Sequence, residues 1–189
     1  MKKIIFLIFL LCSAAVQAEV RLRPSKWAVP VIGSSLQNFY ALDSKIYRSE
    51  QPDSKAFAEL EKFGIQEVLN LRQFHTDNDE AEKTDIKLHH VKMNTDDIKV
   101  EQLVQALKII KNSKGPVLIH CWHGSDRTGI VSASYRIILQ NWSKDHAIEE
   151  LKDGGYGYHA KIYPNIIEML NSLDVQAIKA ELGLLQTPF

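Results

Sequence analysis

Cysteine is scarce in this chain, which has only Cys12 and Cys121 among its 189 residues. A scaffold held together by several disulfides is therefore excluded. A metal site built from His120, Cys121 and His123 would need a second cysteine or histidine pair at ligand spacing, and the sequence offers none. We therefore expect neither a metal nor a cofactor.

Long apolar runs are also missing, except at the amino terminus. Two lysines are followed there by an apolar run from Ile4 to Cys12 and by small residues ending at Ala18. This pattern is typical of a secretory signal, and the run is short for a membrane span. We expect residues 1–18 to be a cleaved signal peptide and the protein to be exported to the periplasm of a bacterium. An uncleaved membrane anchor is the alternative. Cleavage would leave Cys121 as the only cysteine, with no partner for a disulfide within the chain.

Neither sign of charge is in excess. The 23 Lys and Arg residues balance 23 Asp and Glu residues, and loss of Lys2 and Lys3 with the signal would leave 21 basic residues against 23 acidic ones. Proteins that bind nucleic acid usually carry a basic excess, so we expect no nucleic-acid partner. Repeats, low-complexity tracts and linkers are absent too, and residues 19–189 have the length of one domain. We expect that domain to be a monomer.

The stretch from Gly115 to Leu139 predicts a buried strand, a polar turn and a helix. Residues 116–119 form an apolar run with β-branched members, whereas apolar residues recur at helical spacing from Thr128 onwards. The first amides of a helix lack partners and its macrodipole is positive at that end. The turn is therefore expected to bind an anion such as phosphate.

Cys121 opens this turn and Arg127 closes it, with five residues between them. A thiol beside a helix amino terminus and an arginine has its nucleophilic thiolate form stabilised. Arg127 can bind two phosphoryl oxygens at once. Gly124 lets the backbone approach a ligand closely, Thr128 offers a hydroxyl near the thiolate, and His120 is expected to orient the turn.

Residues 120–129 read His-Cys-Trp-His-Gly-Ser-Asp-Arg-Thr-Gly, which resembles the His-Cys-x5-Arg-Ser/Thr-Gly signature of the cysteine-dependent protein tyrosine and dual-specificity phosphatases. The resemblance implies a single α/β domain with a central, mostly parallel sheet flanked by helices on both faces. It also implies a phosphate-binding loop between a strand and a helix, with Cys121 as the nucleophile of a phosphocysteine intermediate and Arg127 as the phosphate ligand. Thr128 would assist departure of the thiolate. The floor and rim of the substrate site would be Trp122, His123, Gly124, Ser125 and Asp126.

A second segment extends this resemblance. Residues 47–52 read Tyr-Arg-Ser-Glu-Gln-Pro, similar to an element of bacterial and fungal dual-specificity-like phosphatases. Residues 38–52 predict two short strands joined by a turn at Asp43 and Ser44. The pair could be an edge hairpin, and Arg48 and Gln51 could either border the active site or lie in solvent.

Two further strands are expected at residues 65–71 and 88–93, after a helix at residues 54–63 that Gly64 ends. Arg72 follows the first of these strands, at the edge where open α/β sheets bind ligands. It could steer an anionic substrate or be an ordinary surface arginine. The polar run at residues 73–83 is expected to be a solvated loop.

The reaction also needs an acid that gives a proton to the leaving oxygen. Asp96 and Asp97 lie in a loop between the expected strand at residues 88–93 and a helix from about Val100. In the phosphatases that this chain resembles, an aspartate on this loop is the general acid, and the offset to the helix favours Asp96. Asp97 is the alternative, and either residue could instead cap the helix.

The substrate expected from the resemblance is a phosphotyrosine-containing protein, with phosphoserine and phosphothreonine as further candidates. The turn has no lysine, and Asp126 adds repulsion toward ligands with several phosphates. Phosphoinositide or inositol-phosphate hydrolysis is the rival function. A phosphate-binding module without catalysis is a third possibility, against which Cys121, Arg127 and Asp96 together argue.

Overall fold

Six strands form one sheet in the order β1-β2-β3-β6-β4-β5. The computed structural model describes residues 23–185, so the expected signal peptide at residues 1–18 lies outside the described residues. The strands are β1 (Val29–Pro30), β2 (Tyr40–Ala41), β3 (Ile46–Ser49), β4 (Glu67–Asn70), β5 (Lys87–His90) and β6 (Val117–His120). Three pairs of neighbours are parallel and the two pairs that involve β2 are antiparallel. The prediction of a mostly parallel sheet is confirmed.

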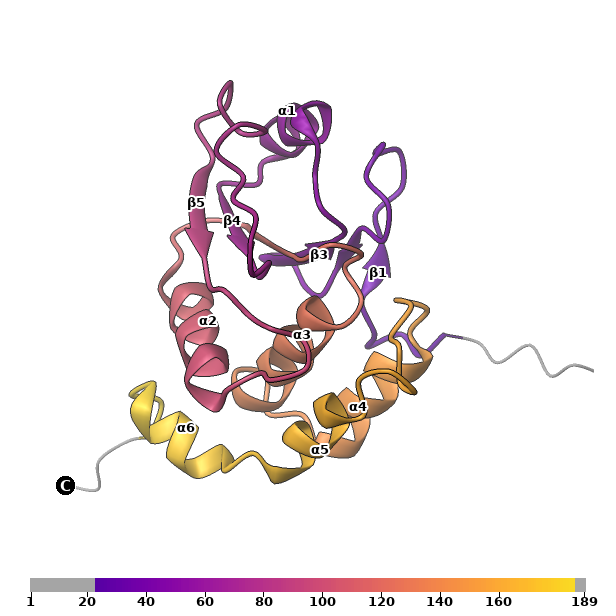
Figure 1. Cartoon of the computed structure of the whole chain (residues 1–189), viewed down its shortest axis with the longest axis vertical. Helices are drawn as coiled ribbons and strands as arrows, with labels where there is room; N and C mark the ends of the chain where they lie inside the picture. The colour runs from indigo at the N-terminus through magenta and orange to yellow at the C-terminus, as the bar shows by residue number, and fades with distance from the viewer. Residues whose placement is uncertain (1–22, 186–189) are drawn as a thin grey trace, which may run out of the picture.

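Helices cover both faces of this sheet, as predicted, and Figure 1 shows α1 on one side and the other helices on the opposite side. The strands alternate between two apolar cores: Val117 and Ile119 of β6 belong to one core and Leu118 belongs to the other. The helices are α1 (Ser54–Phe63), α2 (Val100–Asn112), α3 (Arg127–Ile138), α4 (Lys144–Asp153), α5 (Asn165–Ser172) and α6 (Val175–Glu181).

The parallel register brings three strand ends to one place. His120, the last residue of β6, lies opposite Ser49 of β3 and Asn70 of β4. The loops that follow β3, β4 and β6 therefore leave the sheet at the same edge. The expected convergence of these loops at the carboxyl ends of the strands is what builds the site.

Some local expectations need correction. The helix at residues 54–63 is confirmed, and Gly64 ends it with φ of 103°. Its N-cap is Asp53, which accepts a hydrogen bond from the Ala56 amide at 2.7 Å. The strand expected at residues 65–71 is shorter, at Glu67–Asn70, and the strand expected at residues 88–93 is shorter and begins one residue earlier, at Lys87–His90. The hairpin at residues 38–52 is not an edge hairpin, since β3 lies inside the sheet between β2 and β6.

Among residues 23–185, no helix has the length and apolar character needed to span a bilayer.

Candidate active site

The turn between β6 and α3 has the predicted strand, turn and helix geometry. Residues 121–126 connect the two elements, and the Cys121 side chain is only 3% exposed at the start of the turn. Asp126 occupies the N-cap position of α3, but its side chain makes no capping hydrogen bond. The first amides of α3 are thus left without the carboxylate partner that an N-cap aspartate commonly supplies, which suits an anion-binding site.

The Asp126 carboxylate is directed to a neighbouring loop instead. It accepts hydrogen bonds from the His159 amide at 3.0 Å and from His159 Nδ1 at 2.9 Å. The repulsion expected from Asp126 toward phosphate is therefore reduced, because part of its charge is engaged by His159. The same contact ties the turn to the segment that follows α4.

Gly124 has a packing role, and its expected close approach to a ligand stays a prediction. Its φ is +72°, and a Cβ added there would lie 2.4 Å from the carbonyl oxygen of Ser49. Glycine is thus required at this position because the turn packs directly on the backbone at the end of β3.

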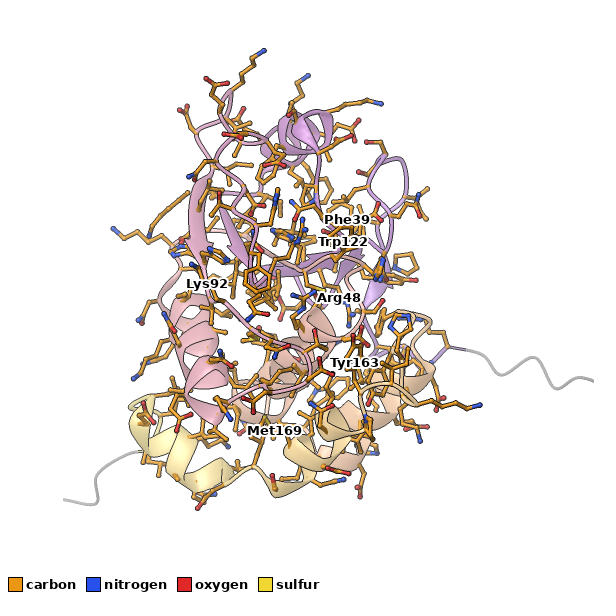
Figure 2. The ribbon with its side chains drawn as sticks, viewed as in Figure 1. Phe39, Arg48, Lys92, Trp122, Tyr163 and Met169 are labelled. Atoms are coloured by element: carbon orange, nitrogen blue, oxygen red, sulfur yellow. The ribbon has the colours of Figure 1, made fainter. Side chains whose placement is uncertain are left out.

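Arg48 is buried, so the solvated interpretation of this residue is wrong. Its Nη2 donates to the Gly124 carbonyl oxygen at 2.6 Å, and its guanidinium lies 3.7 Å from the centroid of the Tyr156 ring. Burial lowers the pKa of Arg48 below its ordinary value, against the opposing effects of Tyr156 and Glu150. Figure 2 labels Arg48, which extends from β3 toward the middle of the molecule. Arg48 therefore holds the turn of residues 121–126 in place through its hydrogen bond to Gly124.

Arg127 and Thr128, the first residues of α3, each have a buried polar atom without a hydrogen-bond partner among the described residues. Arg127 Nη1 donates to the Met93 carbonyl oxygen at 3.5 Å, and its buried Nε has no hydrogen-bond partner within residues 23–185. The hydroxyl of Thr128 is also buried and without a partner in this part of the chain. Buried donors are normally satisfied, so these atoms are suited to a bound phosphoryl group and to the thiolate.

His120 orients the turn through a residue that sequence analysis missed. Its Nε2 lies 2.9 Å from Oδ2 of Asp77 and its Nδ1 lies 3.1 Å from the Cys121 carbonyl oxygen. Both neighbours are acceptors, so both interactions are satisfied when both ring nitrogens carry a proton. His120 thus connects the backbone of Cys121 to the Asp77 carboxylate, which is how it could orient the turn.

Asp77 is only 3% exposed, although the run at residues 73–83 was expected to be solvated. Its carboxylate also accepts hydrogen bonds from Gln51 Nε2 at 2.9 Å and from Asn70 Nδ2 at 3.0 Å. Burial by itself would raise the pKa of Asp77, but the hydrogen bond and charge of His120 and the Gln51 donor outweigh it and lower the pKa below its ordinary value. Nothing in the local sequence separates Asp77 from the exposed acids beside it.

Replacing Asp77 with asparagine is expected to lower the free energy of unfolding by about 2 kcal/mol near neutral pH, because buried hydrogen bonds to charged groups contribute about 1.5–3 kcal/mol. The folded-state pKa of Asp77 is depressed, so its contribution is complete above the unfolded pKa of about 4 and is lost as pH falls through the folded pKa. Urea titrations of the wild type and the variant should therefore differ less as pH falls below about 4. Asp79→Asn, on the exposed part of the same loop, is the matched control. A difference that stayed constant down to acid pH would contradict the assignment.

Arg72 lies at the mouth of the site and is not an isolated surface residue. Its Nη1 donates to Gln51 Oε1 at 3.0 Å, and its guanidinium lies 4.3 Å from the centroid of the Trp122 ring. Burial lowers the pKa of Arg72, and the positive charge of Arg127 lowers it further, whereas Asp77 and Cys121 oppose this. Arg72 and Gln51 therefore both border the turn.

The loop with the candidate acids is attached to the turn and to α5. Arg127 reaches Met93 as described, and Asn165 Nδ2 donates to the Thr95 carbonyl oxygen at 2.9 Å. Asp96 is exposed and its side chain has no partner among the described residues, whereas the Asp97 carboxylate pairs with Lys99. Neither carboxylate caps α2, whose N-cap is Lys99. This geometry is consistent with Asp96 as the acid, which stays a prediction.

The described residues contain one group of three possible metal ligands, and it excludes His120, Cys121 and His123. His75, Asp77 and Glu80 place their ligand atoms within 4.8 Å of one another. Asp77 already accepts hydrogen bonds from three side chains. We assign no metal to this group.

Comparison with known families and sequences agrees with this geometry. The sequence model of the tyrosine phosphatase family matches residues 35–181. The dual specificity protein phosphatase TpbA of Pseudomonas aeruginosa is 34% identical over 140 residues, which are 71% of this chain and 62% of that relative. The chain thus spans less than two thirds of the length of this curated relative.

Solved structures give the same result for the fold. The crystal structure of P. aeruginosa TpbA aligns with a TM-score of 0.76 and 26% identity, covering 86% of this chain and 99% of that one. The inositol diphosphatase SIW14 of Saccharomyces cerevisiae is 30% identical over 155 residues, 77% of this chain and 55% of that protein. The crystal structure of the SIW14 core catalytic domain aligns with a TM-score of 0.64 and 28% identity, covering 85% of this chain and all of that one.

Proposed function

This chain belongs to the tyrosine phosphatase family, and from that membership we propose that it hydrolyses phosphotyrosine in proteins through a phosphocysteine intermediate. Phosphoserine and phosphothreonine are further candidate substrates. The observation that carries the proposal is the turn of residues 121–126, in which a buried cysteine precedes a helix amino terminus whose arginine has a donor without a partner among residues 23–185. A thiolate and an anion site at one place are what attack on a phosphate ester requires.

In the first step, the Cys121 thiolate attacks phosphorus and a P–S bond forms as the P–O bond to the substrate breaks. The amides of the turn and Arg127 bind the equatorial oxygens, and Asp96 donates a proton to the leaving oxygen. In the second step, water attacks phosphorus, the Asp96 carboxylate accepts its proton, and the P–S bond breaks. Thr128 donates a hydrogen bond to the departing thiolate, and inorganic phosphate is released.

Inositol-phosphate or phosphoinositide hydrolysis is the second candidate, because one relative is named an inositol diphosphatase. The turn of residues 121–126 contains no lysine to bind additional phosphates, which favours a substrate with one phosphate. A non-catalytic phosphate-binding module is a third candidate. Turnover by the wild-type protein that the Cys121→Ser replacement abolishes would exclude it.

Hydrolysis of phosphotyrosine peptides, phosphothreonine peptides and inositol phosphates by residues 19–189 should be compared under one set of conditions. We expect the highest kcat/KM for the phosphotyrosine peptide, with phosphate release as the measurement. A higher kcat/KM for inositol phosphates would instead support the second candidate.

We also propose that the protein acts in the periplasm as a monomer after cleavage following Ala18. The pattern of lysines, apolar residues and small residues at residues 1–18 supports export. The intact mass of the protein purified from the periplasmic fraction should correspond to a chain that begins at Glu19. A full-length mass in the membrane fraction would instead support an uncleaved anchor.

A further inference from the structure

Trp122 and His123 are the two exposed residues of the turn at residues 121–126, whose other residues are buried. The Trp122 side chain is 57% exposed, whereas Cys121 before it and Ser125 after it are 3% exposed. Tryptophan is highly buried on average in folded proteins, so a tryptophan this exposed has a face available for contact with another molecule. Because Trp122 follows the candidate nucleophile directly, that contact falls at the entrance of the phosphate site.

The Trp122 indole is held in position by a second residue. The Arg72 guanidinium lies 4.3 Å from the ring centroid, a cation–π contact that covers part of the indole and leaves the rest to solvent. We call this pair the Arg72–Trp122 wall. Figure 2 labels Trp122, which lies beside the sheet in the middle of the view.

Gln51 contacts both residues of the wall, and residues at the ends of β4 and β5 hold the Arg72 backbone. Gln51 Oε1 accepts from Arg72 Nη1 at 3.0 Å, and the Gln51 amide donates to the Trp122 carbonyl oxygen at 2.9 Å. The Arg72 amide donates to Asn70 Oδ1 at 2.7 Å, and His90 Nε2 lies 2.6 Å from the Arg72 carbonyl oxygen. A surface fixed in this way loses little conformational entropy when a ligand binds to it.

We propose that the Arg72–Trp122 wall binds the aromatic ring of phosphotyrosine and so selects aryl phosphates over alkyl phosphates. This inference rests on the proposed phosphatase activity of the same site. In phosphotyrosine the ring is one oxygen away from phosphorus, so it must lie at the entrance when the phosphate occupies the turn. Phosphoserine places only a methylene group there, and an inositol presents a saturated ring with hydroxyl groups. Only the aryl ester can stack on an indole.

The wall is tested by two replacements of Trp122 that differ in aromaticity. Trp122→Leu keeps an apolar side chain and should lower kcat/KM for a phosphotyrosine peptide by about 3- to 10-fold, the range that an aromatic pair contributes. Its kcat/KM for a phosphothreonine peptide should change little, and Trp122→Phe should restore most of the loss. Arg72→Lys keeps the charge but loses the planar group, so it should also reduce the preference for aryl phosphates. Phe74→Ala, which removes an exposed aromatic residue of the neighbouring loop, is the control.

Two results would overturn the proposal. An equal loss for all substrates in Trp122→Leu would mean that the residue only shapes the turn. A loss confined to inositol phosphates in Arg72→Lys would mean that the wall serves additional phosphates.

A binding measurement separates failure of the wall from failure of the proposed activity. In Cys121→Ser, which should bind ligands without turnover, a phosphotyrosine peptide should change tryptophan fluorescence more than inorganic phosphate does at saturation. The change should disappear when Trp122→Phe is added, because Trp27 is buried and Trp142 stacks on Arg136. If the wild type hydrolyses none of the substrates but this signal is present, the proposed activity fails and the wall stands. An equal signal from peptide and phosphate would overturn the wall alone.

Discussion

Replacing Cys121 with serine is expected to lower kcat/KM for phosphotyrosine peptides by on the order of 10⁵-fold, comparable to the loss of a nucleophile in other covalent enzymes. Serine is close to cysteine in shape, but its hydroxyl has no general base in the first step of the proposed mechanism, in which Asp96 acts as the acid. The binding of phosphate by the turn should be retained, because the amides and Arg127 are unchanged. Phosphate release and phosphate binding to the variant measure the two effects separately.

Ser132→Ala is a matched control for this experiment. Ser132 is a small, buried residue of α3 on the helix that begins at the site, and its hydroxyl has no partner within residues 23–185. We expect it to keep near wild-type turnover. Residual activity of Cys121→Ser that a chelator removes would count against a cysteine nucleophile and indicate a metal-dependent reaction.

Replacing Asp96 with alanine is expected to slow hydrolysis of alkyl phosphates by about 10²- to 10⁴-fold, the usual contribution of a general acid. The loss should be much smaller for p-nitrophenyl phosphate, because its leaving group departs without a proton. The ratio of kcat values for the two substrates, measured in wild type and variant, tests the role of Asp96 in leaving-group protonation.

Asp97→Ala is the matched control, since Asp97 is adjacent, also exposed and paired with Lys99. We expect it to change kcat by less than the Asp96 variant for both substrates. The reverse pattern would make Asp97 the acid. If neither variant lowered kcat for alkyl phosphates, the acid would have to come from another loop.

Charged or titratable side chains from three parts of the chain hold the turn of residues 121–126. Asp77 reaches it through His120 from the loop after β4, Arg48 reaches Gly124 from β3, and His159 binds Asp126 from the segment after α4. Each contact involves a charged or potentially charged side chain that is partly or fully removed from solvent. Such interactions are strong only when the geometry is maintained, so these contacts fix the shape of the turn, as the proposed binding of a phosphoryl group requires.

Most of the site-forming turn could be predicted because its signals are local. The change from an apolar strand to helical spacing between Gly115 and Leu139, and the spacing of Cys121 and Arg127, lie within one short stretch. The helix at residues 54–63 ended as predicted at Gly64 for the same reason. Strand ends were predicted less well, because pairing with neighbouring strands decides where a strand stops.

The amino-acid sequence by itself determined the α/β class and singled out the candidate nucleophile and the candidate phosphate-binding arginine, whose signals lie close together in the chain. Only the tertiary structure decided that Asp77 is buried against His120, 43 residues away, and that Arg48 supports Gly124, 76 residues away. It also decided that Arg72 and Trp122 form one wall. The physical reason is that burial and pairing of polar side chains depend on which strand ends meet at the sheet edge, and no local spacing records that.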